Sequence, residues 1–225
     1  MCNNWPDFPI DVFEATGGLI GDTVIICGGS DMLSYVDECY SLTSEKAKLV
    51  THMSLARYGA ASIVLDDNTL WVTGGYNHGG SLASTEYVTV TGTMSGPYLP
   101  MAIYGHAMVA INNTCSMVIG GGNYQAYFSS TFFYDRNEGE WINGPSLMQA
   151  RKWHAAGIVT DEVTDEHFVA ATGGDWSYNS LSFLDSTEIL QDGEWVQGKM
   201  NDMLSCGYSR VRNKRSPTII NFLTF

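Results

Sequence analysis

The sequence predicts an all-β chain built from four similar units. Four apolar runs rich in β-branched residues each end in a pair of glycines, and no segment shows helical periodicity. The 24 glycines against 6 prolines indicate many tight turns between short strands. Apolar residues make up 44% of the chain and charged residues 16%, which is typical of a globular protein with a buried core.

The glycine pairs recur at a nearly constant interval. Their first members lie 46, 46 and 53 residues apart, and the pairs are Gly28-Gly29, Gly74-Gly75, Gly120-Gly121 and Gly173-Gly174. Fourteen residues before the first glycine, the positions of Glu14, Ala60 and His106 each precede a stretch of small and apolar residues. A longer turn at 160–166 accounts for most of the larger last interval. Agreement of several copies in register identifies a true repeat.

Each unit contains four short apolar segments separated by polar turns. A third strand is expected after each glycine loop, at 38–42, 84–88, 130–134 and 186–190, and a fourth is clearest at 139–142 and 193–196. Four antiparallel strands in a unit of this length is the spacing of a propeller blade.

The repeat resembles the kelch family. The features that carry this resemblance are the double glycine after an apolar strand, an aromatic residue about a dozen positions later, Trp141 and Trp195 near the fourth strand, and the Met148-Gln149-Ala150-Arg151 segment. The resemblance covers residues 11–200 and implies a kelch-type β-propeller. The expected repeat region is 11–204, with blades at approximately 11–56, 57–102, 103–150 and 151–204.

Some positions depart from this pattern. Lys48 and Met94 lie near the tryptophan position in the first two units, and Ile103 replaces the arginine found at Arg57 and Arg151. Residues 205–225 contain no fifth glycine pair, so we expect a partial fifth blade or a divergent tail there. Because kelch propellers usually close with about six blades, we expect an incomplete ring, and a fragment of a longer protein.

The chain is strongly acidic. Its formal net charge is −13, from 24 acidic and 11 basic side chains, which disfavours nucleic acid and anionic membranes as partners. The charge either favours a basic partner or serves solubility alone. No apolar run reaches the length of a membrane helix, and the first residues lack the basic and apolar regions of a signal peptide.

Polar and aromatic loops follow the glycine pairs, and we expect them to bind a protein partner. In a blade of antiparallel strands these loops share one face with the connections between blades. The predicted binding residues are Arg57, Tyr76, Asn77, His78, Tyr124, Gln125, Tyr127, Arg151, Asp175, Trp176 and Tyr178. The two arginines are included because, in related propellers, such arginines can bind acidic groups. The alternative is that these are ordinary solvated loops, and the glycine pairs themselves are expected to serve the fold alone.

No catalytic set is visible, so we expect neither an enzyme nor a cofactor. His106 and His154 occupy the same place in successive repeats, which indicates a structural role rather than a metal pair. Gly120-Gly121-Gly122 belongs to the repeat and is not a dinucleotide fingerprint, because no helix is expected after it. A fragment of a galactose-oxidase-like copper enzyme is the less favoured alternative that the resemblance allows.

Two non-enzymatic roles remain open, and the cysteines bear on the choice. One is the substrate-recognition part of a ubiquitin-ligase adaptor in the cytoplasm, and the other is a secreted kelch protein. Cys27 and Cys39 are expected to face each other across the second and third strands of the first unit, as two buried thiols or as a disulfide. Asn112-Asn113-Thr114 is a glycosylation acceptor sequence in a turn.

Overall fold

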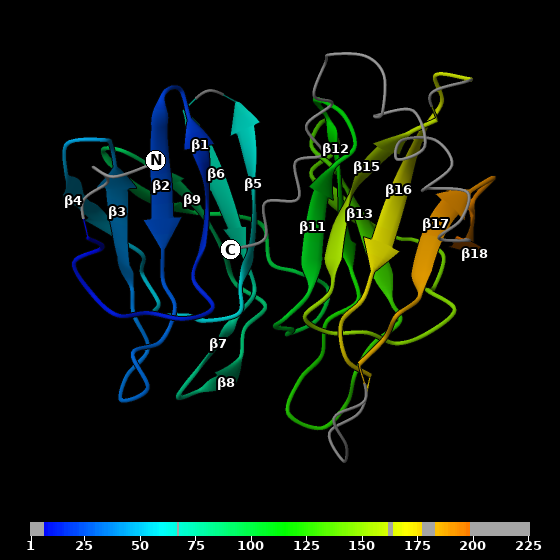
Figure 1. The fold of residues 1–225 in the computed structure, drawn as a ribbon, viewed down its shortest axis with the longest axis horizontal. Coiled ribbons are helices and arrows are strands. Elements are labelled where there is room, and N and C mark those ends of the chain that lie inside the picture. The colour runs from blue at the N-terminus through cyan, green and yellow to red at the C-terminus, as the bar shows by residue number, and fades with distance from the viewer. Residues whose placement is uncertain (1–6, 67, 162–163, 177–182, 199–225) are drawn as a thin grey trace, which may run out of the picture.

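The computed structural model describes residues 7–66, 68–161, 164–176 and 183–198, and over these residues the chain is all-β (Figure 1). All of its strands except the short pair β7 and β8 belong to four antiparallel sheets of four strands. No described segment forms a helix that could cross a membrane. The expected tail at 205–225 lies outside the described residues.

Each sheet comes from one unit of the repeat. The first contains β1 (Thr16–Ile20), β2 (Thr23–Cys27), β3 (Glu38–Leu42) and β4 (Ala47–His52), and the second contains β5 (Ala61–Asp66), β6 (Thr69–Thr73), β9 (Thr85–Thr89) and β10 (Gly92–Ser95). The third contains β11 (Ala107–Ala110), β12 (Cys115–Ile119), β13 (Thr131–Asp135) and β14 (Glu140–Asn143), and the fourth contains β15 (Ala155–Thr160), β16 (His167–Thr172), β17 (Thr187–Gln191) and β18 (Glu194–Gly198). The pair β7 (Tyr76–Asn77) and β8 (Gly80–Ser81) forms a small hairpin after β6. The predicted third strands agree with β3, β9, β13 and β17 to within one residue.

The four sheets follow one another in space as they do in the sequence. The first strands of the sheets contact each other in succession, β1 with β5, β5 with β11, and β11 with β15 (Figure 1). In the first sheet, the turns β1–β2 and β3–β4 lie at one edge. The loops after β2, β6, β12 and β16 lie at the opposite edge of their sheets.

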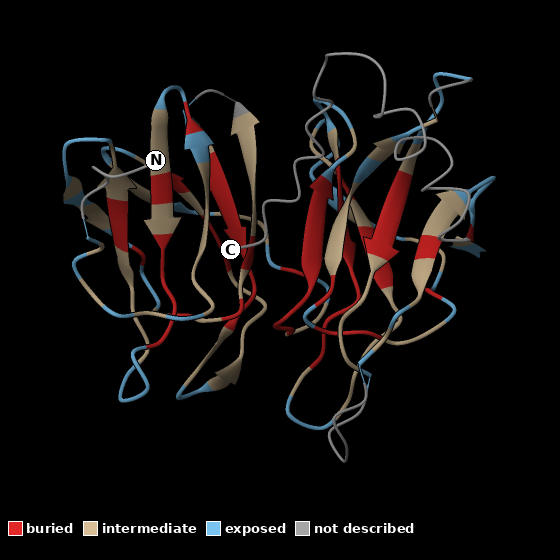
Figure 2. Cartoon of the chain, in the orientation of Figure 1, coloured by how far each residue is buried: buried red, intermediate tan, exposed pale blue. Residues whose placement is uncertain are grey.

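The second strand of an inner unit is buried because it contributes to the core on both of its faces (Figure 2). In β6, Leu70 and Val72 pack in a cluster with the first sheet, whereas Trp71 packs in a cluster with the third sheet. In β12, Val118 packs toward the second sheet, and Met117 packs toward the fourth. Side chains alternate between the two faces of a strand, so a continuous apolar run is what a strand between two sheets requires.

The first three glycine pairs each join their own sheet to the next sheet. The first glycine donates its backbone N–H to the residue before or at the start of the third strand, as in Gly74 to Ser84 O at 3.1 Å. The second donates to the chain that leads into the next sheet, as in Gly75 to Ile103 O at 2.9 Å and Gly121 to Arg151 O at 2.8 Å. All eight glycines of the pairs have positive φ. A Cβ atom on Gly120 would lie 2.7 Å from Arg151 O, so a side chain is excluded there.

A second set of hydrogen bonds joins the segments that precede the first strands. Glu14, Gly59, Gly105 and Trp153 all have positive φ, and each of the last three donates its N–H to the carbonyl of the one before, at 3.0, 2.7 and 2.8 Å. Glu14 therefore corresponds to Gly59 and not to Ala60. The equivalence of Glu14 with Ala60 expected from the constant interval is therefore wrong by one residue. The first unit is one residue shorter than the second between this position and its glycine pair.

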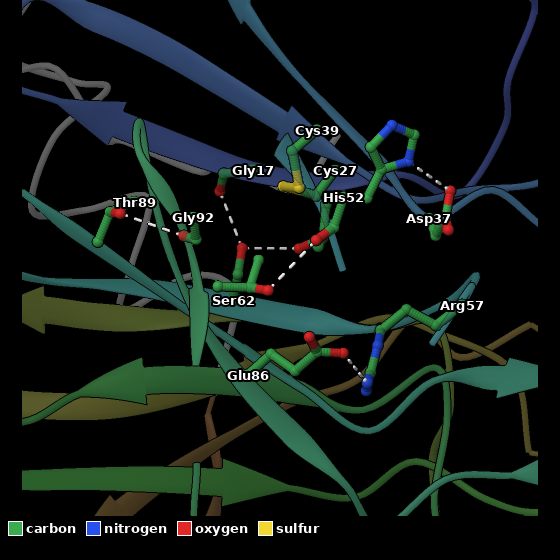
Figure 3. Close-up of a disulfide and its surroundings, with 12 residues drawn as sticks. Gly17, Cys27, Asp37, Cys39, His52, Arg57, Ser62, Glu86, Thr89 and Gly92 are labelled. Carbon is green, nitrogen blue, oxygen red and sulfur yellow. Dashed lines mark hydrogen bonds and ion pairs between the residues drawn. A yellow bond between two sulfur atoms is a disulfide. The ribbon is translucent and has the colours of Figure 1, made fainter. Parts of the chain in front are cut away.

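Cys27 and Cys39 lie directly opposite each other in β2 and β3 and form a disulfide (Figure 3). Both are buried in the cluster between the first and second sheets. The structure therefore contains the bridged alternative in place of two free thiols.

Replacing Gly120 by alanine is expected to lower the free energy of unfolding by about 2 to 4 kcal/mol, since the positive φ and the contact with Arg151 O both oppose a Cβ atom. Gly157→Ala in β15 is the matched control, because its Cβ would meet no atom within 4 Å and its φ is not positive. Urea unfolding of both variants makes the comparison. The control is expected to be neutral or stabilising by up to about 1 kcal/mol, and an equal loss in both variants would contradict the role assigned to Gly120.

Candidate functional site

The loops that follow the glycine pairs and the connections between sheets lie at one edge of the sheets, at the lower side of Figure 1. We call this surface the loop face, and it consists of residues 7–15, 28–37, 53–60, 74–84, 96–106, 120–130, 144–154, 173–176 and 183–186. It contains the loops that leave the glycine pairs and the connections between sheets. The hydrogen bonds between sheets hold it, so its residues have a rigid support.

An aromatic cluster lies on the loop face where the first strands begin. Its members are Phe13, Tyr35, Tyr58, Tyr76, Tyr104 and Trp153. Tyr58 is central: its ring stacks on Tyr35 at 5.3 Å between centroids and on Trp153 at 6.4 Å. Its ring also lies 6.4 Å from Phe13 and between 5.7 and 5.8 Å from Tyr76 and Tyr104. Phe13 and Trp153 remain 44% and 39% exposed, so the cluster offers apolar ring surface to a partner.

The repeat explains why these rings meet. Phe13, Tyr58, Tyr104 and Lys152 each form an isolated β-bridge with the residue that follows the glycine pair of their own unit. They therefore occupy one equivalent position in four successive units. The contacts between first strands bring this position together from all four sheets.

Lys152 is the cationic member of this set, and its side chain is buried against the aromatic cluster. Its Nζ lies 3.2 Å from the centroid of the Tyr104 ring and 5.3 Å from that of Trp153, which is a cation–π arrangement. Burial lowers the pKa of Lys152 to about 8, against the opposing effect of Asp175 and Glu14.

Two carboxyl groups lie near Lys152. Burial raises the pKa of Glu14 to about 7, and its Oε2 is buried without a hydrogen-bond partner in the described part of the chain. Asp175 Oδ2 accepts a hydrogen bond from the Tyr127 hydroxyl at 3.3 Å, while its Oδ1 is buried and has no such partner among the described residues. Burial also raises the pKa of Asp175.

Two pockets open on or beside the loop face, and each is lined by acidic and aromatic residues. The first has a volume of about 240 Å³ and is lined by Ile10, Asp31, Ser34, Tyr35, Val36, Asp37 and Glu38. The second has a volume of about 340 Å³ and is lined by Trp153, Gly174, Asp175, Phe183 and Leu184. We call them the Tyr35 pocket and the Trp153 pocket. Each therefore includes one member of the aromatic cluster.

The structure brings together some of the predicted binding residues. Tyr76 belongs to the aromatic cluster, and His78 is exposed with its ring 4.6 Å from Tyr35. Tyr127 and Asp175 lie beside Lys152.

The other predicted residues differ in their settings. Tyr124, Gln125 and Trp176 are exposed on loops of the loop face, at 77% for Tyr124 and 48% for Trp176. Asn77 shapes its own loop, since its side chain bonds Ala56 O and the Gly79 N–H. Tyr178 lies outside the described residues.

Arg57 and Arg151 do not face a partner, which corrects the prediction made for them. They are 1% and 0% exposed, and each guanidinium pairs with a buried glutamate of its own sheet. Arg57 Nη2 lies 2.7 Å from Glu86 Oε1 (Figure 3), and Arg151 Nη2 lies 2.5 Å from Glu188 Oε1. These glutamates also accept backbone N–H groups of Ser54 and Met148. Each guanidinium group is therefore buried and paired within the fold, where it has a structural role and is not accessible to a partner.

His106 and His154 are buried inside the fold, which fits the structural role expected for them. Both are buried immediately before β11 and β15, and burial lowers the pKa of each to about 3, so both are neutral at physiological pH. The ring of His106 shares a 2.9 Å hydrogen bond with Thr73 Oγ1 of the preceding sheet. Within the described ranges, no group of three or more His, Cys, Asp or Glu residues is arranged to hold a metal ion.

The sequence analysis missed most of the aromatic cluster, together with Glu14 and Lys152. Phe13, Tyr35, Tyr58, Tyr104 and Trp153 were not among the predicted binding residues. A signal was present, because three of the four residues at the bridging position before the first strands are aromatic. Searching the connections between units as well as the loops after the glycine pairs would have found them.

The chain was compared with protein-family models and with curated protein sequences, and neither comparison gives a match.

Protonation of Glu14 is expected to make the stability of the chain depend on pH. Because its pKa is raised from 4.5 to about 7 in the folded chain, the folded state binds more protons than the unfolded state between these values. The stabilisation is therefore complete below pH 4.5, and the free energy of unfolding falls as the pH rises through about 7. Glu14→Gln is expected to remove this component in urea unfolding between pH 4.5 and 8. The exposed Glu138→Gln serves as control, and a pH profile unchanged by Glu14→Gln would contradict the assignment.

Proposed function

We propose that this chain is part of a kelch-type β-propeller and acts as a non-catalytic protein-binding module through its loop face. The succession of four-stranded sheets, the contacts between their first strands and the glycine pairs at equivalent positions support the propeller assignment. On this proposal, each sheet is one blade, and the described blades are part of a ring.

The observation that carries the proposed function is the partly exposed aromatic cluster on the loop face. Tyrosine and tryptophan rings supply large contact areas at a small cost in conformational entropy, and they are enriched among the residues that dominate binding energy. Here Tyr58 and its neighbours are held by the hydrogen bonds between sheets, so little ordering would be needed on binding. Exposed Tyr124 and Trp176 extend the same surface.

The shifted pKa values of Glu14 and Lys152 fit binding better than proton transfer. Such shifts also occur at catalytic sites, but burial is the largest cause for both groups. We therefore assign these side chains to recognition and propose no reaction for them.

Between the two cellular roles, the disulfide favours a secreted protein over a ubiquitin-ligase adaptor. A buried Cys27–Cys39 bridge forms and persists in an oxidising compartment, whereas cytoplasmic thiols are kept reduced. The adaptor remains the alternative.

Alanine substitutions on the loop face are expected to weaken binding of a protein partner. Phe13→Ala, Tyr124→Ala and Trp176→Ala each remove an exposed ring. At least one of these variants is expected to lower the affinity for the partner about tenfold, because the rings at the centre of an interface supply most of the binding energy. A partner is first identified by cross-linking and mass spectrometry, and its affinity for each variant is then measured by biolayer interferometry.

The matched controls are Met94→Ala and Ile142→Ala, which remove exposed apolar side chains from the fourth strands β10 and β14. Their affinity for the partner is expected to equal that of the unaltered chain. If all three loop-face variants bind as tightly as the controls, the loop face is not the binding surface.

A further inference from the structure

We propose that the loop face receives a basic segment of its protein partner, with one cationic side chain in the Tyr35 pocket and another in the Trp153 pocket. This inference rests on the proposed function and specifies the chemistry of the partner. Three features of the described residues support it: the acidic lining of the pockets, the aromatic surface that joins them, and the distribution of charge on the loop face.

The Tyr35 pocket is suited to an ammonium or guanidinium group. Asp31, Asp37 and Glu38 line it beside the Tyr35 ring. The backbone N–H groups of Ser34 and Leu33 donate to Asp31 and lower its pKa, so this carboxylate is ionised at neutral pH. Asp37 Oδ1 lies 3.1 Å from His52 Nδ1 (Figure 3), and Glu38 accepts a hydrogen bond from the Tyr40 hydroxyl. Carboxylates held in this way bind cations without first being ordered.

The Trp153 pocket offers a second position for a cation. Its walls are the rings of Trp153 and Phe183, and its acidic group is Asp175. Asp175 Oδ1 is buried and accepts no hydrogen bond from the described residues, although Oδ2 accepts one from Tyr127. A cationic side chain in this pocket would lie beside the Asp175 carboxylate and the two rings.

The aromatic cluster connects the two pockets without a break. Tyr35 belongs to the first pocket and stacks on Tyr58, and Tyr58 stacks in turn on Trp153 of the second pocket. The aliphatic parts of lysine and arginine side chains pack on such rings, and their charged ends are attracted to the ring faces. Lys152 already binds the Tyr104 ring in this manner within the same cluster.

Charge on the loop face has one predominant sign. Its accessible charged side chains are acidic in the described segments, namely Asp7, Asp11, Asp31, Asp37, Asp175 and Asp185. The basic side chains of the same segments, Arg57, Arg151 and Lys152, are all buried, and the two arginines are paired with Glu86 and Glu188. A basic partner therefore meets a complementary field, while an acidic one meets repulsion.

Binding of short synthetic peptides tests this inference on the full chain. Fluorescein-labelled hexa-arginine is compared by fluorescence anisotropy with hexa-citrulline, its neutral isostere, and with hexa-glutamate. Hexa-arginine is expected to bind at least about tenfold more tightly than either, and more weakly as the salt concentration rises. Equal binding of hexa-arginine and hexa-citrulline would overturn the inference.

Matched charge variants separate the pockets from the general acidity of the chain. Asp31→Asn/Asp37→Asn is expected to weaken hexa-arginine binding about fivefold or more, and Asp175→Asn about threefold or more. Glu138→Gln/Glu140→Gln removes two exposed carboxylates from the turn between β13 and β14 and the start of β14, at the opposite edge of the sheets, and is expected to change the affinity by less than about 1.5-fold. If this control weakens binding as much as Asp31→Asn/Asp37→Asn does, the attraction is not located in the pockets and the inference fails.

The same variants distinguish a failure of this inference from a failure of the proposed function. If Phe13→Ala or Tyr124→Ala weakens binding of the native partner while the pocket variants change neither partner nor peptide binding, the loop face binds protein but not through basic side chains. If the pocket variants weaken hexa-arginine and the native partner together, both proposals are supported. If no loop-face variant affects the native partner, the proposed function itself is wrong.

Discussion

The two backbone N–H groups of each glycine pair are the interaction on which the rest of the structure depends. In all four pairs the first N–H completes the pairing of the second and third strands within a sheet, and in the first three pairs the second N–H bonds the segment that leads into the next sheet. Both require positive φ and a close approach of backbones, which glycine alone permits without strain. A glycine pair thus ends the second strand of one sheet and also fixes the segment that leads into the next sheet. Four sheets whose strands pair separately are therefore held together as one rigid unit.

The candidate binding surface is a consequence of this arrangement. The segments fixed by the second glycines carry the bridging positions of Tyr58, Tyr104 and Lys152, and Phe13 occupies the same position before the first sheet. The first strands bring this position together from all four sheets. Three aromatic rings and one ammonium group at equivalent positions therefore meet on the loop face. The buried ion pairs Arg57–Glu86 and Arg151–Glu188 fix the connections that lead into the second and fourth sheets. Both glutamates also accept backbone N–H groups of these connections.

The repeat made most of the fold predictable, and the limits of the site prediction have physical causes. The glycine pairs and the apolar runs before them fix the frame of each unit, so the third strands were predicted to within one residue. Tyr76, His78, Tyr127 and Asp175 were predicted on the loop face because they closely follow glycine pairs. Arg57 was misjudged because its partner Glu86 lies 29 residues away, and local sequence does not show that a guanidinium is enclosed. Tyr35 and Trp153 are joined through Tyr58, and these contacts depend on how the sheets are arranged around each other.

Hydrogen exchange of the backbone amides of Gly29, Gly75 and Gly121 tests the central claim most directly, because among the described residues these members of the pairs donate between sheets. Measured by NMR on the folded chain, these three amides are predicted to exchange as slowly as those of Trp71 and Val118 in the buried second strands, since their hydrogen bonds open only when the sheets separate. Exchange of all three at the rate of unprotected loop amides would contradict the account. It would mean that the sheets are not held together through the glycine pairs, and that the loop face has no rigid support.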